Sequence, residues 1–201
     1  MKCVHNLNTA MKPHMTEAEF TAFVGFVGNA ACYTEFGAGG STYIATQIVK
    51  DRVISVDSSR EWLHRVEKEC AGEECKAKLD LCFVDIGPVG EWGTPINDPE
   101  YRSQWPDYYQ SVWALEGSAS ADLYFIDGRF RVACTMQILL NCHPDSLILI
   151  HDFAPRSNYH VVRDVAREIF SYETLSAFLP RHDIPKERLN ELLIKHRFDY
   201  A

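Results

Sequence analysis

The strongest constraint on the fold is an alternation of short apolar runs with segments of helical period along the 201-residue chain. Strands and helices alternating at this spacing are typical of a mostly parallel sheet with helices on both faces. The expected strands are almost continuously apolar, as strands buried on both sides are. They span residues 31–36, 52–56, 79–84, 121–126 and 146–150, with a sixth at 172–179. We therefore expect a doubly wound α/β fold in a single domain, 1–201.

Helical patterns fill the segments between these strands. Thr16 and Glu19 form a capping-box pattern, which predicts a helix that runs to Val27 within an N-terminal helical segment, 1–29. Pro185 is expected to begin the last helix, because proline suits the first helical position. The remaining helices are expected at 41–50, 59–70, 130–141 and 157–170. Every expected helix except the first thus follows a strand, as a doubly wound fold requires.

Net charge and cysteine content exclude several classes of protein. The formal net charge is −8 and the chain shows no basic stripe, so we expect no nucleic-acid partner. Residues 1–15 lack the apolar core of a signal peptide, and no apolar run approaches the ~20 residues that cross a bilayer. The seven cysteines include no CxxC pair, which favours buried free thiols over a disulfide framework or a zinc site. Because free thiols suit a reducing compartment, we expect a cytoplasmic protein without a membrane partner.

Four of the expected strands end in an acidic residue: Asp57, Asp85, Asp127 and Asp152. In open α/β sheets, ligands bind outside the carboxyl ends of the strands, so these carboxylates are expected at the binding edge. Acidic residues also cap helices, so any one of the four alone would carry little information. Their regular recurrence predicts a ligand site at this edge.

A glycine-rich turn, Glu35-Phe36-Gly37-Ala38-Gly39-Gly40-Ser41, follows the first expected strand. Glycines let the backbone approach a ligand closely, and the helix that follows offers free N–H groups to a carboxylate or phosphate. A dinucleotide and S-adenosylmethionine (SAM) both suit such a turn. The dinucleotide fingerprint G-x-G-x-x-G needs a glycine where this chain has Thr42. Glu35 has no role in that fingerprint but could face the α-ammonium and sulfonium of SAM, so the turn favours SAM over NAD.

Further acidic residues suit an adenosine-containing ligand. Asp57 follows Gly37 at about the interval at which a carboxylate meets a ribose diol. Asp85 and Ile86 could frame the adenine, with a carboxylate for its exocyclic amine and an apolar side chain for its ring face. The alternative for Asp85 is a cap for the loop that follows it. These positions support adenosine without separating SAM from NAD.

The series of motifs resembles the class I SAM-dependent methyltransferases from about Tyr33 to Asp152. The phrases Asp85-Ile86-Gly87-Pro88 with Glu91-Trp92-Gly93, and Ile126-Asp127-Gly128-Arg129-Phe130-Arg131-Val132-Ala133-Cys134, are similar to a group of bacterial methyltransferase-like proteins of unassigned substrate. The resemblance implies that the glycine turn lines the methionine part, Asp57 the ribose, and Asp85 with Ile86 the adenine. The expected cofactor site comprises Glu35, Gly37, Ala38, Gly39, Ser41, Asp57, Ser58, Asp85, Ile86 and Asp127.

One branch of that family, the catechol-type and antibiotic-type O-methyltransferases, holds a magnesium ion on acidic residues that follow strands four and five. This chain has Asp127 and His151-Asp152 there. The resemblance implies Asp127 and Asp152 as Mg²⁺ ligands, and a bound ion would lower the pKa of a substrate hydroxyl. His151 departs from the branch, because imidazole is a poorer ligand for magnesium. We take Asp127 and His151 as the catalytic candidates, with a structural role for His151 as the alternative.

Segment 86–107 is a long stretch rich in glycine, proline and aromatic residues. Such a loop inside a compact domain is often functional, which makes it a candidate substrate lid. It could equally be a packed excursion whose tryptophans fill a satellite core. Arg129 and Arg131 flank Phe130 beside Asp127; they could clamp an acidic substrate, although structural ion pairs with Asp127 or Asp152 are favoured.

The C-terminal region departs from the family pattern. The family sheet usually ends in an antiparallel hairpin, whereas only one convincing strand follows Phe170, so the edge is expected to be atypical. A homodimer contact through this edge is a hypothesis. The function we expect is SAM-dependent methylation of an oxygen or nitrogen of a small molecule. The alternatives are an NAD-dependent oxidoreductase and a non-catalytic SAM-binding or partner domain.

Overall fold

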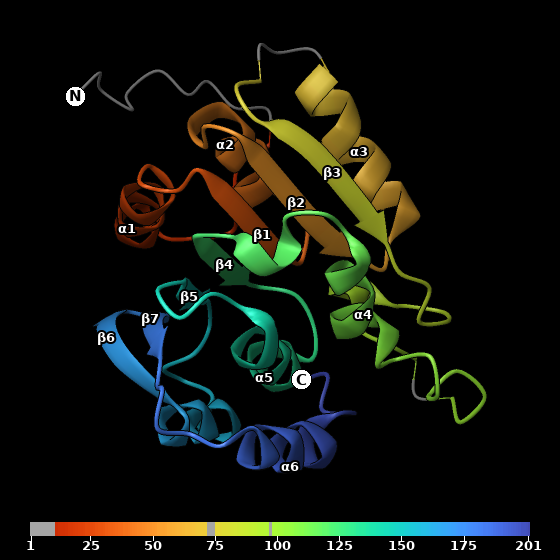
Figure 1. The fold of residues 1–201 in the computed structure, drawn as a ribbon. Helices are drawn as coiled ribbons and strands as arrows, with labels where there is room; N and C mark the ends of the chain where they lie inside the picture. Colours follow the sequence, from red (N-terminus) through yellow and green to blue (C-terminus); the bar gives the residue numbers. More distant parts are fainter. Residues whose placement is uncertain (1–10, 72–74, 97) are drawn as a thin grey trace.

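The structure is a computed structural model that describes residues 11–71, 75–96 and 98–201. Seven strands form one sheet in the order β3-β2-β1-β4-β5-β7-β6 (Figure 1). The first five are mutually parallel, and β7 is antiparallel to both β5 and β6. The strands are β1 Cys32–Phe36, β2 Arg52–Asp57, β3 Lys78–Phe83, β4 Leu123–Ile126, β5 Leu147–Ile150, β6 Ala166–Tyr172 and β7 Leu175–Pro180. The five parallel strands confirm the sequence prediction to within two residues at each end.

Helices cover both faces of the sheet, which confirms the doubly wound α/β class. Helices α1, α2 and α3 pack on one face and α4, α5 and α6 on the other (Figure 1). Alternate strand residues serve the two faces, so Tyr33 lies in the first core and Phe36 in the second. The helices are α1 Glu17–Val27, α2 Gly40–Ile48, α3 Arg60–Ala71, α4 Asp107–Gln110, α5 Arg131–Asn141 and α6 Lys186–His196.

The prediction of a helix at 157–170 is wrong beyond Asp164. Ser157–Asp164 forms the 3-10 helix η5, and the chain then enters strand β6. A register shift between Glu168 and Phe170 interrupts the two-residue alternation of this strand, which removes its signal from the sequence. Strand β7 begins at Leu175, not at residue 172. The sheet therefore ends in an antiparallel hairpin, so the expectation of an atypical edge is wrong.

The loop between β3 and α4 divides into two parts with different packing. Residues 88–96 form a small hairpin closed by the Val89–Pro95 bridge, with Trp92 76% exposed near its tip. Farther along, Trp105 is buried against Phe130. Position 97 lies outside the described residues. Trp105 therefore fits the interpretation of a packed satellite core. Within the described part of the loop, the exposed hairpin 88–96 is the part that could still act as a substrate lid.

Two other sequence expectations can be compared with the described residues. All six cysteines in the described ranges carry free thiols, and Cys3 lies outside those ranges. Within the same ranges, no helix combines the length and the apolar character that crossing a bilayer requires. The homodimer through the sheet edge stays a hypothesis; the edge strand β6 does expose Ile169 and Tyr172.

Candidate functional site

The glycine turn connects β1 to α2 at the carboxyl edge of the sheet. Gly37 has φ +106°, a left-handed conformation that glycine adopts without strain. A Cβ there would lie 2.5 Å from the backbone nitrogen of Gly128, so the turn packs directly on the end of β4. The hydroxyl of Thr42 accepts a 2.8 Å hydrogen bond from the Gly39 N–H. Thr42 therefore closes the turn from within, at the position where a dinucleotide fingerprint would have glycine.

Glu35 lies beneath this turn and is fully buried. One carboxylate oxygen, Oε2, accepts 2.8 Å hydrogen bonds from the hydroxyls of Tyr33 and Ser41. Burial raises the pKa of Glu35 to about 7, although the neighbouring hydroxyls oppose that rise. No surface of Glu35 faces the outside of the turn. Its expected contact with the cofactor stays a prediction, and the observed geometry supports the turn through Ser41.

Asp57 and Ser58 stand where β2 ends, beside the turn. Asp57 accepts a 3.0 Å hydrogen bond from the Ala38 N–H through Oδ2 and a 2.8 Å bond from the Ser59 N–H through Oδ1. Burial raises the pKa of Asp57, while these amides and the charge of Arg129 act in the opposite direction. Ser58 is buried next to it. The structure thus brings Asp57 to the glycine turn, as the sequence predicted.

Asp85 and Ile86 follow the carboxyl end of β3, at the same edge of the sheet. Asp85 is exposed, and its Oδ1 accepts a 3.0 Å hydrogen bond from the Gly87 N–H, which is the loop-capping arrangement. Ile86 is only 1% exposed and belongs to the core. Its side chain is therefore not free to face a ring, whereas Asp85 still has an exposed carboxylate.

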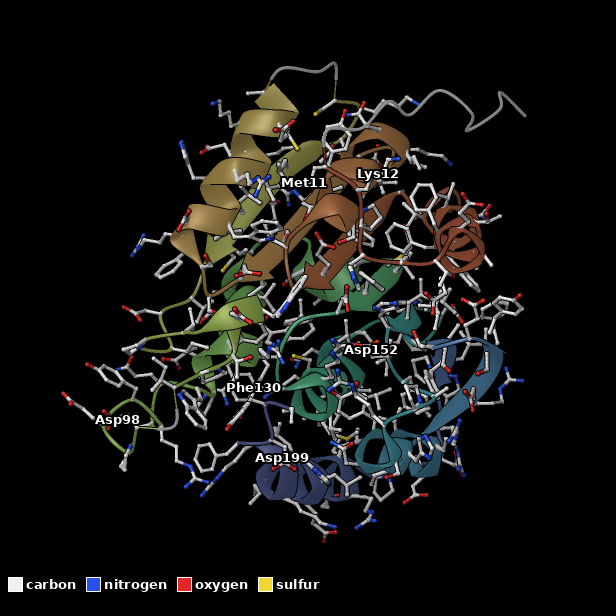
Figure 2. The ribbon with its side chains drawn as sticks, turned by 180° about the vertical axis from the view of Figure 1, so that it is seen from behind. Met11, Lys12, Asp98, Phe130, Asp152 and Asp199 are labelled. Atoms are coloured by element: carbon white, nitrogen blue, oxygen red, sulfur yellow. The ribbon has the colours of Figure 1, made fainter. Side chains whose placement is uncertain are left out.

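The N-terminal segment covers the glycine turn from outside, and hairpin 88–96 lies beside it. Backbone atoms of Lys12 and Pro13 lie so close to α2 that a Cβ on Gly40 would come within 2.3 Å of them, and Figure 2 shows Lys12 beside α2. Hairpin 88–96 lies over the neighbouring strand ends, where the rings of His14 and Trp92 are 5.7 Å apart. The N-terminal segment 11–15 and hairpin 88–96 therefore meet at His14 and Trp92, beside the turn, a contact that no local sequence pattern predicts.

Arg129 links the end of β4 to that hairpin. Its Nε and Nη2 donate hydrogen bonds of 2.9 and 2.8 Å to the carbonyl oxygen of Trp92. Trp92 has φ +57°, a conformation uncommon for a bulky residue, and the two bonds hold its carbonyl in this position. Neither expectation for Arg129 describes this contact, because the partner is a backbone carbonyl and not a carboxylate or a substrate.

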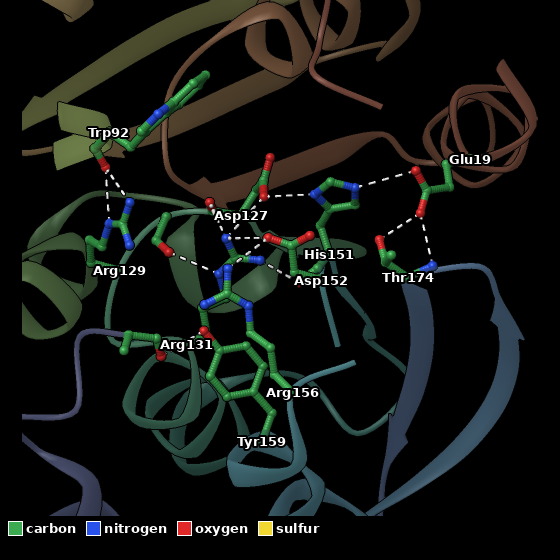
Figure 3. Close-up of polar contacts among 12 residues, drawn as sticks. Glu19, Trp92, Asp127, Arg129, Arg131, His151, Asp152, Arg156, Tyr159 and Thr174 are labelled. Atoms are coloured by element: carbon green, nitrogen blue, oxygen red, sulfur yellow. Dashed lines mark hydrogen bonds and ion pairs between the residues drawn. The ribbon is translucent and has the colours of Figure 1, made fainter. Parts of the chain in front are cut away.

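Arg131 joins the ends of β4 and β5 (Figure 3). Its guanidinium is 3.3 Å from Asp127 Oδ1 and 3.3 Å from Asp152 Oδ2. The same group donates to the backbone carbonyls of Gly128 and Asp127, at 2.9 Å each, and of His151. Arg131 thus forms the structural ion pairs that the sequence analysis favoured, and it is 6% exposed.

His151 lies between two carboxylates and is 5% exposed. Its Nδ1 is 2.9 Å from Asp127 Oδ1, and its Nε2 is 3.5 Å from Glu19 Oε2 (Figure 3). Burial opposes the charged ring, but the hydrogen bond and negative charge of Asp127 outweigh it and raise the pKa of His151. One ring nitrogen is bonded to Asp127, and the other is buried beside Glu19, so neither nitrogen faces an open acceptor position. The geometry therefore favours the structural role for His151 over that of general base.

Glu19 is a member of this site that the sequence analysis recognised only as a helix cap. The capping box with Thr16 is present, and Oε1 also accepts hydrogen bonds from the N–H and hydroxyl of Thr174, at 2.9 and 2.6 Å. Burial would raise the pKa of Glu19, but these bonds lower it to about 2. The partners lie 155 residues apart, so no local pattern could have predicted their contact.

Comparison with known proteins identifies solved structures of the same fold. The crystal structure of a methyltransferase-like protein from Silicibacter pomeroyi matches 94% of this chain and 98% of its own, with 30% sequence identity and a TM-score of 0.84. The chain belongs to the class I SAM-dependent methyltransferase family. No protein-family model and no curated protein matches the sequence.

Two more distant structures share the fold of this methyltransferase. A methyltransferase from Geobacter sulfurreducens covers 83% of the chain and 82% of its own, at 9% identity and a TM-score of 0.57. An RNA methyltransferase from Salinibacter ruber, in complex with S-adenosylhomocysteine (SAH), covers 86% and 96% at 10% identity and a TM-score of 0.52. The strand order also differs from the parallel dinucleotide-binding order 3-2-1-4-5-6, because β7 is inserted antiparallel between β5 and β6. The NAD-dependent alternative is therefore disfavoured.

The residues expected to bind magnesium do not fit that ion. Asp127, His151 and Asp152 do lie together, with ligand atoms within 4.8 Å of one another. However, Arg131 approaches the facing oxygens of both carboxylates, and the nearer nitrogen of His151 is bonded to Asp127. Mg²⁺ requires oxygen ligands in nearly octahedral geometry, whereas the facing oxygens here already accept from N–H groups. We derive no step through a metal ion.

Proposed function

We propose that this methyltransferase transfers the methyl group of SAM to an oxygen or nitrogen atom of a small molecule. One observation carries the proposal: a tight glycine turn packs against both Asp57 and the end of β4, in a chain whose 30% identical relative is methyltransferase-like. Helix α2 begins at Gly40, directly after the turn, and the N–H groups in the first turn of a helix suit the carboxylate of a ligand. The carboxylate of Asp57 stands beside it for a diol.

The proposed cofactor position follows from these contacts. The methionine end would lie on Gly37, Ala38 and Gly39, with the ribose at Asp57 and Ser58 and the adenine toward Asp85. Glu35 and Ser41 would support the turn from below, because their side chains bond to each other in the interior. Ile86 would support the adenine region as a core residue, since its side chain is buried.

The chemistry asks little of individual side chains. A lone pair of the acceptor attacks the methyl carbon, the carbon–sulfur bond breaks, and SAH leaves. Holding the acceptor and the methyl group in near-attack geometry supplies most of the acceleration. Asp127 is the candidate for receiving the acceptor's proton, because it is only half-buried and its carboxylate contacts to Arg131 and His151 use Oδ1. Its second oxygen is then available to the acceptor.

A small acceptor is favoured over nucleic acid by electrostatics. The chain carries a formal net charge of −8, which repels a polyanion. The structural neighbour that is an RNA methyltransferase has only 10% sequence identity, so its substrate does not transfer to this chain. The half-buried Asp127 and Asp152, which stand beside the proposed cofactor position, would face the acceptor.

Calorimetric titration with SAH and with NADH tests this proposal. We expect SAH to bind and NADH not to bind. Asp57→Ala should lower the affinity for SAH at least about tenfold, because a hydrogen bond to a charged group is lost. Asp51→Ala is the matched control, since Asp51 is exposed just before the opposite end of β2. Binding of NADH without SAH would contradict the proposal. If a cellular activity of the chain survived loss of SAH binding, the non-catalytic alternative would hold.

A further inference from the structure

The guanidinium of Arg131 lies where the two site carboxylates converge. Its Nη2 is equidistant, at 3.3 Å, from Asp127 Oδ1 and Asp152 Oδ2, which come from the ends of two adjacent strands. Asp152 has φ +54°, so its backbone adopts an uncommon conformation at this place. A divalent ion bound by the same two carboxylates would have to compete with this guanidinium for their facing oxygens.

Arg131 is fixed in this position by more than the two carboxylates. Three backbone carbonyls, those of Asp127, Gly128 and His151, accept hydrogen bonds from its Nη2, Nε and Nη1 respectively. A buried arginine with its donors satisfied in this way is costly to displace, because its charge would lose every compensating contact at once. The guanidinium is also close to the ring of Tyr159, at 5.9 Å from its centroid.

We propose that Arg131 is a positioning residue that takes the place of a divalent metal ion: it neutralises and orients Asp127 and Asp152, so the site binds cofactor and acceptor without metal. A guanidinium supplies several directed donors from one fixed plane, which matches a set of carboxylate and carbonyl oxygens. A metal ion at this place would need the same carboxylate oxygens, Asp127 Oδ1 and Asp152 Oδ2. Each carboxylate has a second partner. His151 Nδ1 is 2.9 Å from Asp127 Oδ1, and Arg156 Nη2 is 3.1 Å from Asp152 Oδ2.

The proposal restricts the chemistry that the acceptor can use. A catechol-like hydroxyl pair would gain nothing from chelation here, because no metal joins it to the carboxylates. The acceptor would instead approach the free oxygens of Asp127 and Asp152 and donate a hydrogen bond. This consequence rests on the proposed function, whereas the exclusion of a metal ion by Arg131 does not.

Titration with Mn²⁺, followed by the electron paramagnetic resonance signal of the free ion, tests the proposal on the whole chain. We expect the wild-type protein to bind no Mn²⁺ with a dissociation constant below about 100 µM, with or without SAH. EDTA should leave SAH affinity unchanged. Stoichiometric Mn²⁺ binding to the wild type that Asp152→Asn abolishes would overturn the proposal. A protein that binds neither Mn²⁺ nor SAH would instead count against the proposed function alone.

The Arg131→Met variant makes the test positive, because it removes the cation and leaves the carboxylates facing each other. We expect it to gain one Mn²⁺ and to lose it again when Asp152→Asn is added. Arg188→Met is the matched control, since Arg188 lies exposed on α6 and its side chain pairs with Glu191, far from the two site carboxylates. A folded Arg131→Met protein that gains no Mn²⁺ would overturn the proposal. If that variant does not fold, the wild-type titration decides.

Discussion

Glu35 illustrates, at the scale of single residues, how a motif position can have a structural basis that its sequence context conceals. Position and charge suggested a group facing the α-ammonium of SAM. In the structure the carboxyl is enclosed with the hydroxyls of Tyr33 and Ser41, and burial raises its pKa to about 7. With a pKa near 7, this carboxyl is protonated in a large share of the molecules at neutral pH. It contributes to the turn through its hydrogen bonds to Tyr33 and Ser41.

The raised pKa of Glu35 predicts a pH-dependent stability. Because the folded-state pKa lies above the unfolded value, its contribution is present below pH 4.5 and is lost as pH rises through 7. The loss is at most about 3 kcal/mol. We expect Glu35→Gln to match the wild type near pH 5 and to exceed it in unfolding free energy at pH 8, measured by urea denaturation. A variant-to-wild-type difference that is constant from pH 5 to pH 8 would refute this account.

At the scale of secondary-structure elements, the main finding is that buried polar contacts connect α1 to the carboxyl edge of the sheet. Glu19 connects α1 to the turn before β7 through Thr174 and to β5 through His151. His151 in turn contacts Asp127 after β4. The N-terminal helix therefore helps to fix the carboxylate that we propose faces the acceptor.

Removing the charge of Glu19 should loosen this connection. We expect Glu19→Gln to lower the free energy of unfolding by about 2 kcal/mol at pH 7, because the buried carboxylate contacts to Thr174 and His151 are weakened together. Thermal and urea denaturation measure the effect. Glu17→Gln, an exposed substitution in the same first turn of α1, should change stability by less than about 0.5 kcal/mol. Equal effects of the two substitutions would show that the buried pair contributes nothing.

Hairpin 88–96 is the second element whose position matters. Since it meets the N-terminal segment 11–15 beside the glycine turn, we expect a bound cofactor to leave past the contact of His14 with Trp92. Two hydrogen bonds from Arg129 hold the Trp92 carbonyl. We expect Arg129→Ala to speed SAH dissociation about tenfold in stopped-flow tryptophan fluorescence, because about 1–2 kcal/mol of restraint is lost. Arg167→Ala, on the distant edge strand β6, is the control. If SAH dissociates from Arg129→Ala no faster than from Arg167→Ala, the hairpin does not restrain the cofactor.

At the scale of the whole molecule, local signals predicted the parallel strands, the glycine turn and the acidic strand ends. Each depends on a few consecutive residues, so one sequence suffices to find it. The C-terminal hairpin escaped because the shift between Glu168 and Phe170 breaks the alternation that marks a strand. The burial of Ile86 and the contact of Glu19 with His151 escaped because they depend on segments far apart in the chain. Local sequence patterns therefore predicted the edge of the candidate site better than its interior.

The whole account depends on SAM binding at one place, and a crystal structure of the chain with SAH, grown above the measured dissociation constant, tests this most directly. We predict density for the methionine end on Gly37–Gly39, for the ribose at Asp57 and for the adenine toward Asp85, with hairpin 88–96 above it. The space left between the sulfur and Asp127 would then bound the size of the acceptor. SAH bound elsewhere on the chain, with the glycine turn unaltered and uncontacted, would contradict the account.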